Sequence, residues 1–440
     1  MIESNRLGKW RKSHYCSEII PKEEGKEAVL MGWVEDIRDL GGIKFFNLRD
    51  STGKVQITAP KSKVDKNVFD EFDSLNKESA IGVKGKIKKS DKAPGGVELI
   101  PEEIKEFGKA KTPLPLDPTG RVDADLDTRL DARPLDLRRP KPNAILSIKN
   151  HVLQIFRENL LSRGFHEVNT PKMVGSATES GTALFPIQYF DREAFLSQSP
   201  QLYKEVLVSS FEKVFEVGPV FRAEEHDTRY HLNEVLSGDL EMAYATKEDV
   251  MEILEELIIN ILQGIKNEAE KELETLEMEI EVPEKPLPRI TYQEAINKLQ
   301  TNGENISWGD DFSIPEQRVL GGIMGKPYFV VDWPTEEKPF YIMPDKEDER
   351  ICEAFDLLYN EIELASGGTR IHQKDLLEER LKKDGLSPKQ FDYHLKNFDW
   401  GMPPHAGWGL GIERLVMVIT GADNIRECVL FPRDRKRLKP

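Results

Sequence analysis

The chain has 440 residues, 32% of them charged, and a formal net charge of −16 at pH 7. This length predicts two or three domains with enough material for a large core. The composition is typical of a soluble globular protein, and no stretch approaches the roughly 20 apolar residues that a membrane span needs. The acidic balance argues against non-specific binding to nucleic acid, although it leaves room for a local basic face.

The N-terminus and the cysteines indicate a reducing compartment. The first residues lack the basic-then-apolar pattern of a signal peptide. Cys16, Cys352 and Cys428 are odd in number and far apart, which favours free thiols over a disulfide framework or a zinc site. We therefore expect a cytoplasmic protein.

Residues 15 to 107 have the pattern of a small all-β domain. Short runs rich in β-branched or apolar residues alternate with turn signals such as Gly41-Gly42 and Gly95-Gly96. The clearest runs are 27–33, 43–48, 55–58 and 80–87. About five short strands in this length predict a small barrel of the oligonucleotide-binding (OB) kind, with a generic β-sandwich as the alternative.

Prolines and arginines gather between residues 109 and 142. The prolines interrupt any helix and predict an extended hinge on the surface. Contact of the basic residues with a nucleic-acid backbone is the alternative. The expected domains are therefore a barrel at 1–107, a hinge at 108–142 and a larger domain at 143–440.

The larger domain mixes helices and strands. Apolar residues recur at helical spacing from Ile145 to Leu160, and Gly164 is placed to end that helix. A second helix is expected to begin at Thr246, with Asp249 as its capping partner. Strand-like runs at 214–221, 328–333, 340–343, 362–365 and 428–431 predict an antiparallel sheet. Because strands and helices do not alternate regularly, the fold class is α+β rather than doubly wound α/β.

Two arginines carry the clearest chemical signal. Arg222 lies in Val-Gly-Pro-Val-Phe-Arg-Ala-Glu, and Arg414 lies in Gly-Leu-Gly-Ile-Glu-Arg-Leu. A planar guanidinium can hold an anionic group with two hydrogen bonds, so two such residues in one folded domain suggest a polyphosphate substrate. The glycines at 407–411 and 321–325 follow neither the dinucleotide-binding nor the phosphate-loop pattern.

A second polar cluster runs from Glu361 to His372. In a strand, Glu361 and Glu363 share one face, and a carboxylate followed by Ser366 and two glycines could hold Mg²⁺ against phosphate oxygens. Arg370 could then pair with a substrate carboxylate. The alternative is an exposed strand with solvated charges that ends in a Gly-Gly turn.

Two further polar features have structural alternatives. Lys204 ends the run Ser-Gln-Ser-Pro-Gln-Leu-Tyr-Lys, either as a point charge or as a surface lysine. His226 and His231 have no further ligand nearby, so a contact to phosphate is favoured over zinc.

Taken together, these runs resemble the three signature motifs of class II aminoacyl-tRNA synthetases. The helix leading to 164–171 is similar to motif 1, 221–234 to motif 2 and 409–414 to motif 3. The order of barrel, hinge and catalytic domain resembles the subgroup for Asp, Asn and Lys, and details favour the archaeal-type aspartyl enzymes. The resemblance implies a homodimer that uses ATP and Mg²⁺ to attach L-aspartate to tRNA through aspartyl-adenylate.

The resemblance also implies roles for single residues, with Arg222 and Arg414 as the catalytic pair. Aspartate would be bound by Glu179, Gln201, Leu202, Tyr203, Lys204, Arg222, Asp239, Ser366 and Arg370. ATP would be bound by Arg222, Ala223, Glu224, Tyr230, His231, Leu232, Glu363, Gly411, Ile412, Glu413 and Arg414. Mg²⁺ would be held by Glu363 and Ser366, and the anticodon by Phe45, Gln56 and Glu98.

The chain departs from the family pattern in two places. Related sequences usually have arginine directly before the histidine that matches His231, whereas this chain has Tyr230 there and Arg229 before it. In the barrel, Glu35 and Pro94 stand where enzymes restricted to tRNA(Asp) tend to carry bulky or basic residues. Proline at the second place accompanies relaxed discrimination, so we expect charging of both tRNA(Asp) and tRNA(Asn).

Other functions stay open on the sequence. One is an aspartyl-tRNA synthetase restricted to tRNA(Asp), and another is an asparaginyl-tRNA synthetase. An ATP-dependent amidating ligase that makes free asparagine and a non-catalytic scaffold with a nucleic-acid-binding barrel are the remaining alternatives.

Overall fold

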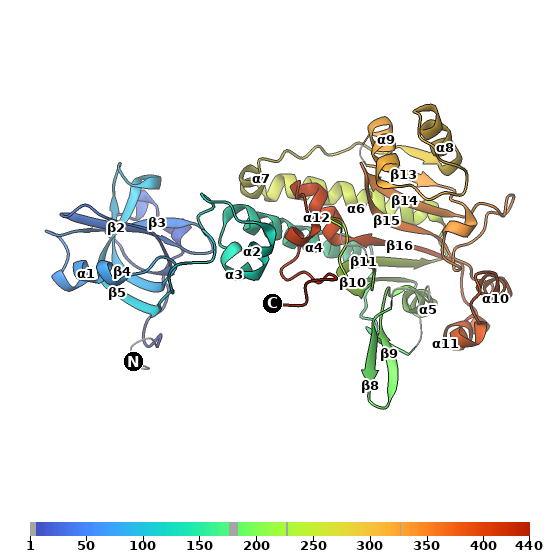
Figure 1. Cartoon of the computed structure of the whole chain (residues 1–440), viewed down its shortest axis with the longest axis horizontal. Helices are drawn as coiled ribbons and strands as arrows, with labels where there is room; N and C mark the ends of the chain where they lie inside the picture. Colours follow the sequence, from blue (N-terminus) through green and yellow to red (C-terminus); the bar gives the residue numbers. More distant parts are fainter. Residues whose placement is uncertain (1–5, 176–183, 226–227, 326) are drawn as a thin grey trace. The chain divides into compact units, whose positions relative to one another are not determined.

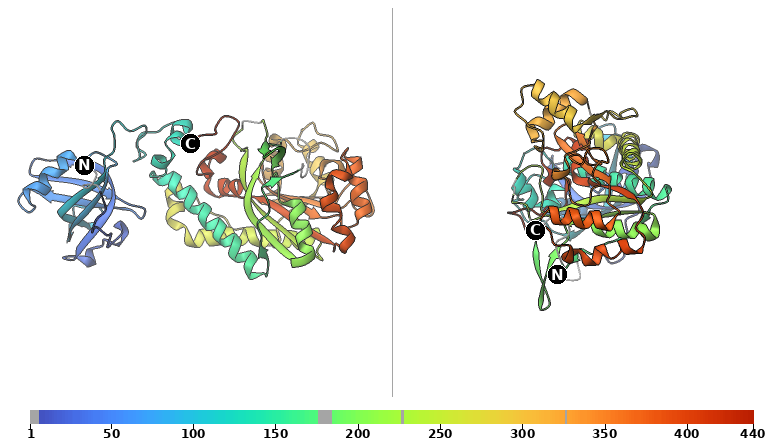
Figure 2. Two further views of the ribbon diagram at one scale, coloured as in Figure 1. Left: turned by 90° about the horizontal axis from the view of Figure 1, so that it is seen from below. Right: turned by 90° about the vertical axis from the view of Figure 1, so that its right-hand side faces the viewer.

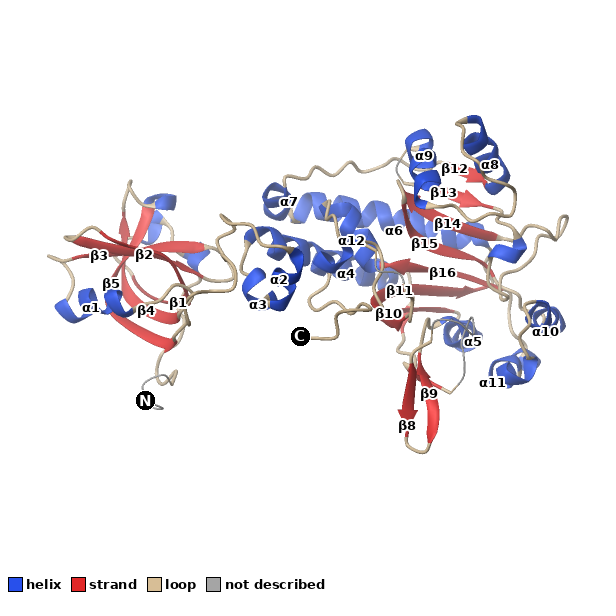
Figure 3. Ribbon diagram, viewed as in Figure 1, coloured by secondary structure: helices blue, strands red, loops and turns tan. Residues whose placement is uncertain are grey.

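The computed structural model describes residues 6–175, 184–225, 228–325 and 327–440 (Figure 1). The chain divides into two compact units, one ending at Thr128 and the other beginning at Arg129. The first unit is built on strands, and the second combines a large sheet with helices (Figure 3). No described helix is long and apolar enough to cross a membrane.

The first unit is a closed five-stranded barrel, as the sequence predicts. Its strands are β1 (Glu27–Asp39), β2 (Ile43–Arg49), β3 (Lys54–Pro60), β4 (Ala80–Lys89) and β5 (Val97–Gly108), in the order β1-β2-β3-β5-β4. Side chains that alternate along the strands, such as Leu30, Phe46 and Val83, fill the interior. The helix α1 (Lys66–Glu71) packs against β3 and β5.

The stretch expected to be an extended hinge, 108–142, contains two helices and the start of a third, so part of that expectation was wrong. They are α2 (Leu126–Asp131), α3 (Arg133–Asp136) and α4 (Pro140–Ser162). Pro134 and Pro140 occupy the first turns of α3 and α4, where the missing N–H would have no helical partner anyway. Arg133 is fully buried and donates to the carbonyls of Glu427, Val429 and Leu430, which makes it a structural residue of the second unit.

The second unit is organised around an eight-stranded mixed sheet in the order β12-β13-β14-β15-β16-β11-β10-β6. The strands are β6 (His166–Glu167), β10 (Lys213–Phe221), β11 (Glu234–Ala243), β12 (Arg289–Thr291), β13 (Tyr328–Val331), β14 (Ala354–Tyr359), β15 (Ile362–Thr369) and β16 (His405–Gly411). Pairing is parallel only for β12 with β13 and β6 with β10. The centre of the sheet is therefore antiparallel, as expected.

Long helices cover one face of this sheet. The helices α4, α6 (Lys247–Glu268) and α12 (Ile412–Thr420) share an apolar core with its central strands, and α4 lies beside α6 (Figure 2). The capping box of Thr246 and Asp249 starts α6 as predicted. Gly164 follows α4 with a positive φ of 79°, a conformation that favours glycine at a helix end.

Smaller elements surround the sheet. They are the three-stranded sheet of β7 (Met173–Val174), β8 (Pro186–Tyr189) and β9 (Arg192–Leu196), and the helices α5 (Gln201–Phe211), α7 (Glu270–Leu276), α8 (Tyr292–Thr301), α9 (Ile314–Met324), α10 (Lys374–Lys383) and α11 (Asp392–Leu395).

Two predicted strands are wrong, and several strands of the large sheet were missed, among them β11, β14 and β16. Residues 340–343 make only an isolated bridge through Ile342, and Cys428 ends a 3-10 helix. Apolar β-branched residues alone did not specify a strand there, because pairing depends on a neighbouring edge. Conversely, the glycines of 407–411 belong to β16. A side chain at Gly407 would collide with the carbonyl of Leu240 on β11, so close strand packing requires glycine.

Candidate active site

A cavity of about 280 Å³ lies on the sheet face opposite the long helices. Successive residues of a strand point to opposite faces. Asp239, Gly409 and Ser366 are aligned across β11, β16 and β15 and line the cavity. Their neighbours Leu240 and Trp408 point into the core on the helix side. The alternation within three adjacent strands thus creates one polar and one apolar face.

The structure brings Arg222 and Arg414 to this same cavity. Arg222 directly follows β10, and its side chain is 52% exposed, with Nη1 3.9 Å from Glu224 Oε1. Arg414 lies in the first turn of α12 and donates from Nη1 to the carbonyl of Glu363 at 3.0 Å. Two guanidinium groups from distant segments therefore face one space with room for an anion.

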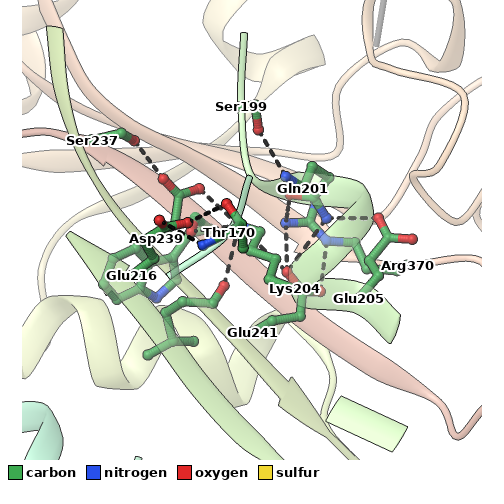
Figure 4. Close-up of polar contacts among 12 residues, drawn as sticks. Thr170, Ser199, Gln201, Lys204, Glu205, Glu216, Ser237, Asp239, Glu241 and Arg370 are labelled. Atoms are coloured by element: carbon green, nitrogen blue, oxygen red, sulfur yellow. Dashed lines mark hydrogen bonds and ion pairs between the residues drawn. The ribbon is translucent and has the colours of Figure 1, made fainter. Parts of the chain in front are cut away.

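A buried polar network forms another wall of the cavity (Figure 4). Arg370 donates from Nε to Glu241 at 3.0 Å and from Nη2 to the Gln201 carbonyl oxygen at 3.3 Å. Lys204 lies 3.0 Å from Asp239 and 3.5 Å from Glu241. Both cations are about 2% exposed, so their charges are only partly screened by water.

Glu363 and Ser366 line the cavity together, at the start and middle of β15. Among the described residues, no group of three or more His, Cys, Asp or Glu side chains could hold a metal by itself. Mg²⁺ that binds with a nucleotide usually takes one or two protein carboxylates and completes its shell with phosphates and water. A carboxylate and a hydroxyl beside two arginines fit that kind of site.

Asp356 and Lys338 support this part of the wall and were missed by the sequence analysis. Asp356 is opposite Ser366 in the β14–β15 register, and Lys338 Nζ lies 2.6 Å from its Oδ2. Burial raises the pKa of Asp356 despite the neighbouring ammonium group. Their spacing in the sequence carries no motif, because strand register brings Asp356 to Ser366 and Lys338 approaches from the segment after the 3-10 helix Thr335–Glu337.

Most of the proposed ATP and aspartate residues line the cavity. They are Gln201, Arg222, Glu224, Tyr230, His231, Leu232, Asp239, Glu363, Ser366, Arg370, Gly411, Glu413 and Arg414. Glu413 has its own structural partners, because its oxygens accept from Lys149 at 2.7 Å and from the Leu236 N–H at 3.0 Å.

The other proposed residues are not among those that line it. Leu202 is buried in a separate apolar core, and Lys204 stands behind Asp239. Tyr203, Ala223 and Ile412 do not line the cavity either, although Ala223 and Ile412 are each next in the chain to residues that do. Glu179 and His226 lie outside the described residues.

The loop after β10 shows what replaces the usual arginine. Tyr230 is buried and lines the cavity. The guanidinium of Arg229 lies 4.7 Å from the centre of the Tyr230 ring and 3.8 Å from Glu361. Arg318 also contacts Glu361, at 3.1 Å. Arg229 is thus held beside the cavity and is not part of its lining.

In the barrel, the three proposed anticodon residues come from neighbouring strands. Gln56 on β3 pairs with Glu98 on β5, and its amide lies 3.4 Å from that carboxylate. Phe45 on β2 pairs with Thr58, whose hydroxyl donates to Glu98 at 2.8 Å. A half-buried aromatic ring beside amide and carboxylate groups is typical of a surface that stacks and reads single-stranded bases.

The two proposed discrimination residues differ in environment. Glu35 is 5% exposed and bonded to Arg49 at 3.0 Å and Lys54 at 3.2 Å. Pro94 is exposed in the turn between β4 and β5. Glu35 is therefore held in ion pairs with two cations of the barrel, whereas Pro94 is exposed to solvent.

Comparison with known proteins agrees with this arrangement. Residues 125–435 match the family described as tRNA synthetases class II (D, K and N), and residues 28–107 match the OB-fold nucleic acid binding domain. The Aspartate--tRNA(Asp/Asn) ligase of Methanococcus aeolicus is 52% identical over 435 residues, 99% of each chain. The protein of the same name from Methanopyrus kandleri is 53% identical and covers 98% of this chain and 100% of its own.

Solved structures show the same fold over the full length. The asparaginyl-tRNA synthetase from Pyrococcus horikoshii complexed with asparaginyl-adenylate has a TM-score of 0.92 and 38% identity, over 98% of this chain and 100% of that one. The aspartyl tRNA synthetase from Entamoeba histolytica has a TM-score of 0.87 and 32% identity, over 100% of this chain and 95% of that one. With both of its units matched in order, the chain belongs to the class II tRNA synthetases of the D, K and N group.

Proposed function

We propose that this protein is an aspartate–tRNA ligase that charges both tRNA(Asp) and tRNA(Asn). Full-length relatives with about half of their residues identical carry the name Aspartate--tRNA(Asp/Asn) ligase. The observation that carries the proposal is the placement of Arg370 and Lys204 beside the cavity that Arg222 and Arg414 also face. Such a site suits a dicarboxylic amino acid next to a polyphosphate.

In the first step, the α-carboxylate of aspartate attacks the α-phosphorus of ATP, forms a carbon–oxygen–phosphorus link and releases pyrophosphate. The nucleophile is already anionic, so the step needs no strong base. Arg222 and Arg414 bind and align the phosphates and offset the charge that develops there. In the second step, a terminal ribose hydroxyl of tRNA takes the aspartyl group and releases AMP.

Glu363 and Ser366 would hold Mg²⁺, which supplies charge neutralisation on the phosphate oxygens. Glu363 also accepts, through its backbone carbonyl, a hydrogen bond from Arg414. The protein thereby ties the position of the arginine to the strand that would carry the metal. We further propose a homodimer, from the resemblance of the α4 region to motif 1, and a cytoplasmic location, from the three free cysteines.

Two cations support aspartate over asparagine as the substrate. Arg370 would bind the side-chain carboxylate directly and Lys204 would act on it from behind Asp239, so a neutral amide there would lose the ionic contact that these cations offer. Sites built around such pairing reject the unmatched analogue by a factor of about 10⁴. ATP–pyrophosphate exchange tests this choice: we expect exchange with aspartate and a rate with asparagine lower by at least about a thousandfold. Comparable rates with asparagine would overturn the assignment.

The tRNA range is tested by aminoacylation of purified tRNA(Asp) and tRNA(Asn). We expect the two kcat/KM values to agree within about a hundredfold, a difference of less than roughly 3 kcal/mol, because Pro94 adds neither bulk nor charge at the exposed turn. Pro94→Lys should lower charging of tRNA(Asn) selectively, and it should leave pyrophosphate exchange unchanged. A larger preference of the wild type for tRNA(Asp) would limit the protein to that tRNA.

A further inference from the structure

A buried carboxylate and two histidines lie behind the cavity wall, and the steps above do not use them. Glu205 lies one turn after Gln201 on α5 and accepts from the Gln201 amide nitrogen at 2.7 Å. Its other oxygen lies 3.3 Å from His394 Nε2 and 3.9 Å from His405 Nε2. The three side chains are at most 1% exposed, so they are not ordinary solvated surface charges.

Glu205 determines which way the Gln201 amide points. The amide nitrogen faces Glu205 at 2.7 Å and Glu241 at 3.4 Å, and the amide oxygen accepts from Arg370 at 3.3 Å. The reversed amide would place its oxygen against two carboxylates and its N–H groups against a guanidinium. Because Gln201 lines the cavity, this orientation decides which of its atoms a substrate meets.

Geometry also indicates the protonation of His405. Its Nδ1 lies 2.8 Å from the carbonyl oxygen of Pro403, which can only accept, so Nδ1 carries a proton. A neutral ring would then turn the lone pair of Nε2 toward Glu205, whereas an imidazolium turns an N–H toward it. Burial by itself lowers the pKa of His405, but Glu205, Glu241 and the Pro403 carbonyl together outweigh burial and the pKa is raised.

The charge balance of the network depends on this proton. Three carboxylates, Asp239, Glu241 and Glu205, meet two basic side chains, Lys204 and Arg370. Without a charged histidine the buried network carries an excess negative charge. That excess would oppose the side-chain carboxylate of an aspartate substrate in a weakly screened site.

We propose that Glu205 and His405 form a buried positioning pair for the amino-acid substrate. Glu205 holds the Gln201 amide with its oxygen toward Arg370, and His405 in its protonated form offsets the charge of Glu205. The inference rests on the proposed function, since it assigns the pair to recognition of aspartate. The titratable groups that face His405 are Glu205 on α5, Glu241 on β11, His394 on α11 and His372 after β15.

Steady-state pyrophosphate exchange with variants of the full-length protein tests the pair. His405→Gln should raise the KM for aspartate by at least about tenfold, equivalent to about 1.4 kcal/mol, with the KM for ATP changed less than about twofold. The double variant Glu205→Gln/His405→Gln should bind aspartate better than His405→Gln alone, because removing both charges restores the balance. If the two residues were only structural, the double variant should have a higher KM for aspartate than His405→Gln.

A pH series provides a second measurement that needs no histidine variant. In the wild type, the KM for aspartate should stay low below the raised pKa of His405 and increase as the pH passes above it. In Glu205→Gln this increase should move to lower pH, since the ring has lost its anionic partner. An unchanged profile in Glu205→Gln would overturn the proposal.

Glu255→Gln is the matched control, because Glu255 is also buried but accepts from the Leu287 N–H, away from the cavity. It should change neither KM. Failure of the inference differs from failure of the proposed function: a wild type without aspartate-dependent exchange removes the function itself. A wild type that exchanges, with additive losses in the variants, removes only the role of the pair.

Discussion

Two sides of the same cavity treat charge differently. Arg222 is 52% exposed and its nearest carboxylate is 3.9 Å away. Arg370 has an exposed side-chain fraction of 3%, and it is bonded to Glu241 at 3.0 Å and to Gln201. A solvated guanidinium is available to a ligand at little structural cost, whereas a buried one belongs to the fold as well as to the site. Substitutions should therefore separate activity from stability on one side only.

The largest effect is expected for Arg370→Gln. It leaves Glu241 buried with Lys204, at 3.5 Å, as its remaining cationic partner among the described residues, and breaking a buried pair costs about 3–5 kcal/mol of stability. We expect a lower melting temperature together with pyrophosphate exchange reduced by at least about a thousandfold, since the substrate carboxylate loses a partner. Loss of activity with an unchanged melting temperature would mean that Arg370 is not part of the folding core.

Arg222→Gln should affect activity alone. Removing a group that stabilises developing charge lowers kcat by about 10²–10³, while loss of an exposed ion pair costs at most about 1 kcal/mol. Single-turnover adenylate formation measures the loss of activity, and thermal unfolding measures the change in stability. Arg350→Gln is the control, because Arg350 is exposed, pairs with Asp348 and lies outside the cavity lining. It should leave both quantities unchanged.

Arg229→Ala should have the smallest effect, because it tests an arginine that lies beside the cavity and does not line it. The Arg229 guanidinium lies on the Tyr230 ring near Glu361 and outside the cavity lining. An exposed cation–π contact contributes about 0.5–1 kcal/mol, so the KM for ATP should rise by no more than about fivefold. A loss as large as that of Arg222→Gln would show that Arg229 reaches the phosphates during turnover.

Much of the fold followed from local patterns in the sequence. The barrel runs, the capping box at Thr246 and the glycine at 164 depend on neighbours within a few residues. Many of the residues assigned to ATP by motif, such as Glu224, His231 and Arg414, line the cavity. Short motifs carry this information because each places its side chains on one strand or helix end.

The tertiary structure alone decided what surrounds those residues. The glycine-rich run at 407–411 pairs as a strand with β11, whose Leu240 carbonyl leaves no room for a side chain at Gly407. Asp356 meets Ser366 through strand register, and Glu205 meets His394 and His405 across elements distant in sequence. The sequence by itself identified many of the charged groups of the site, since each belongs to a short motif of neighbouring residues. Their partners and burial depended on long-range packing, because only the folded chain fixes which charges share a weakly screened space.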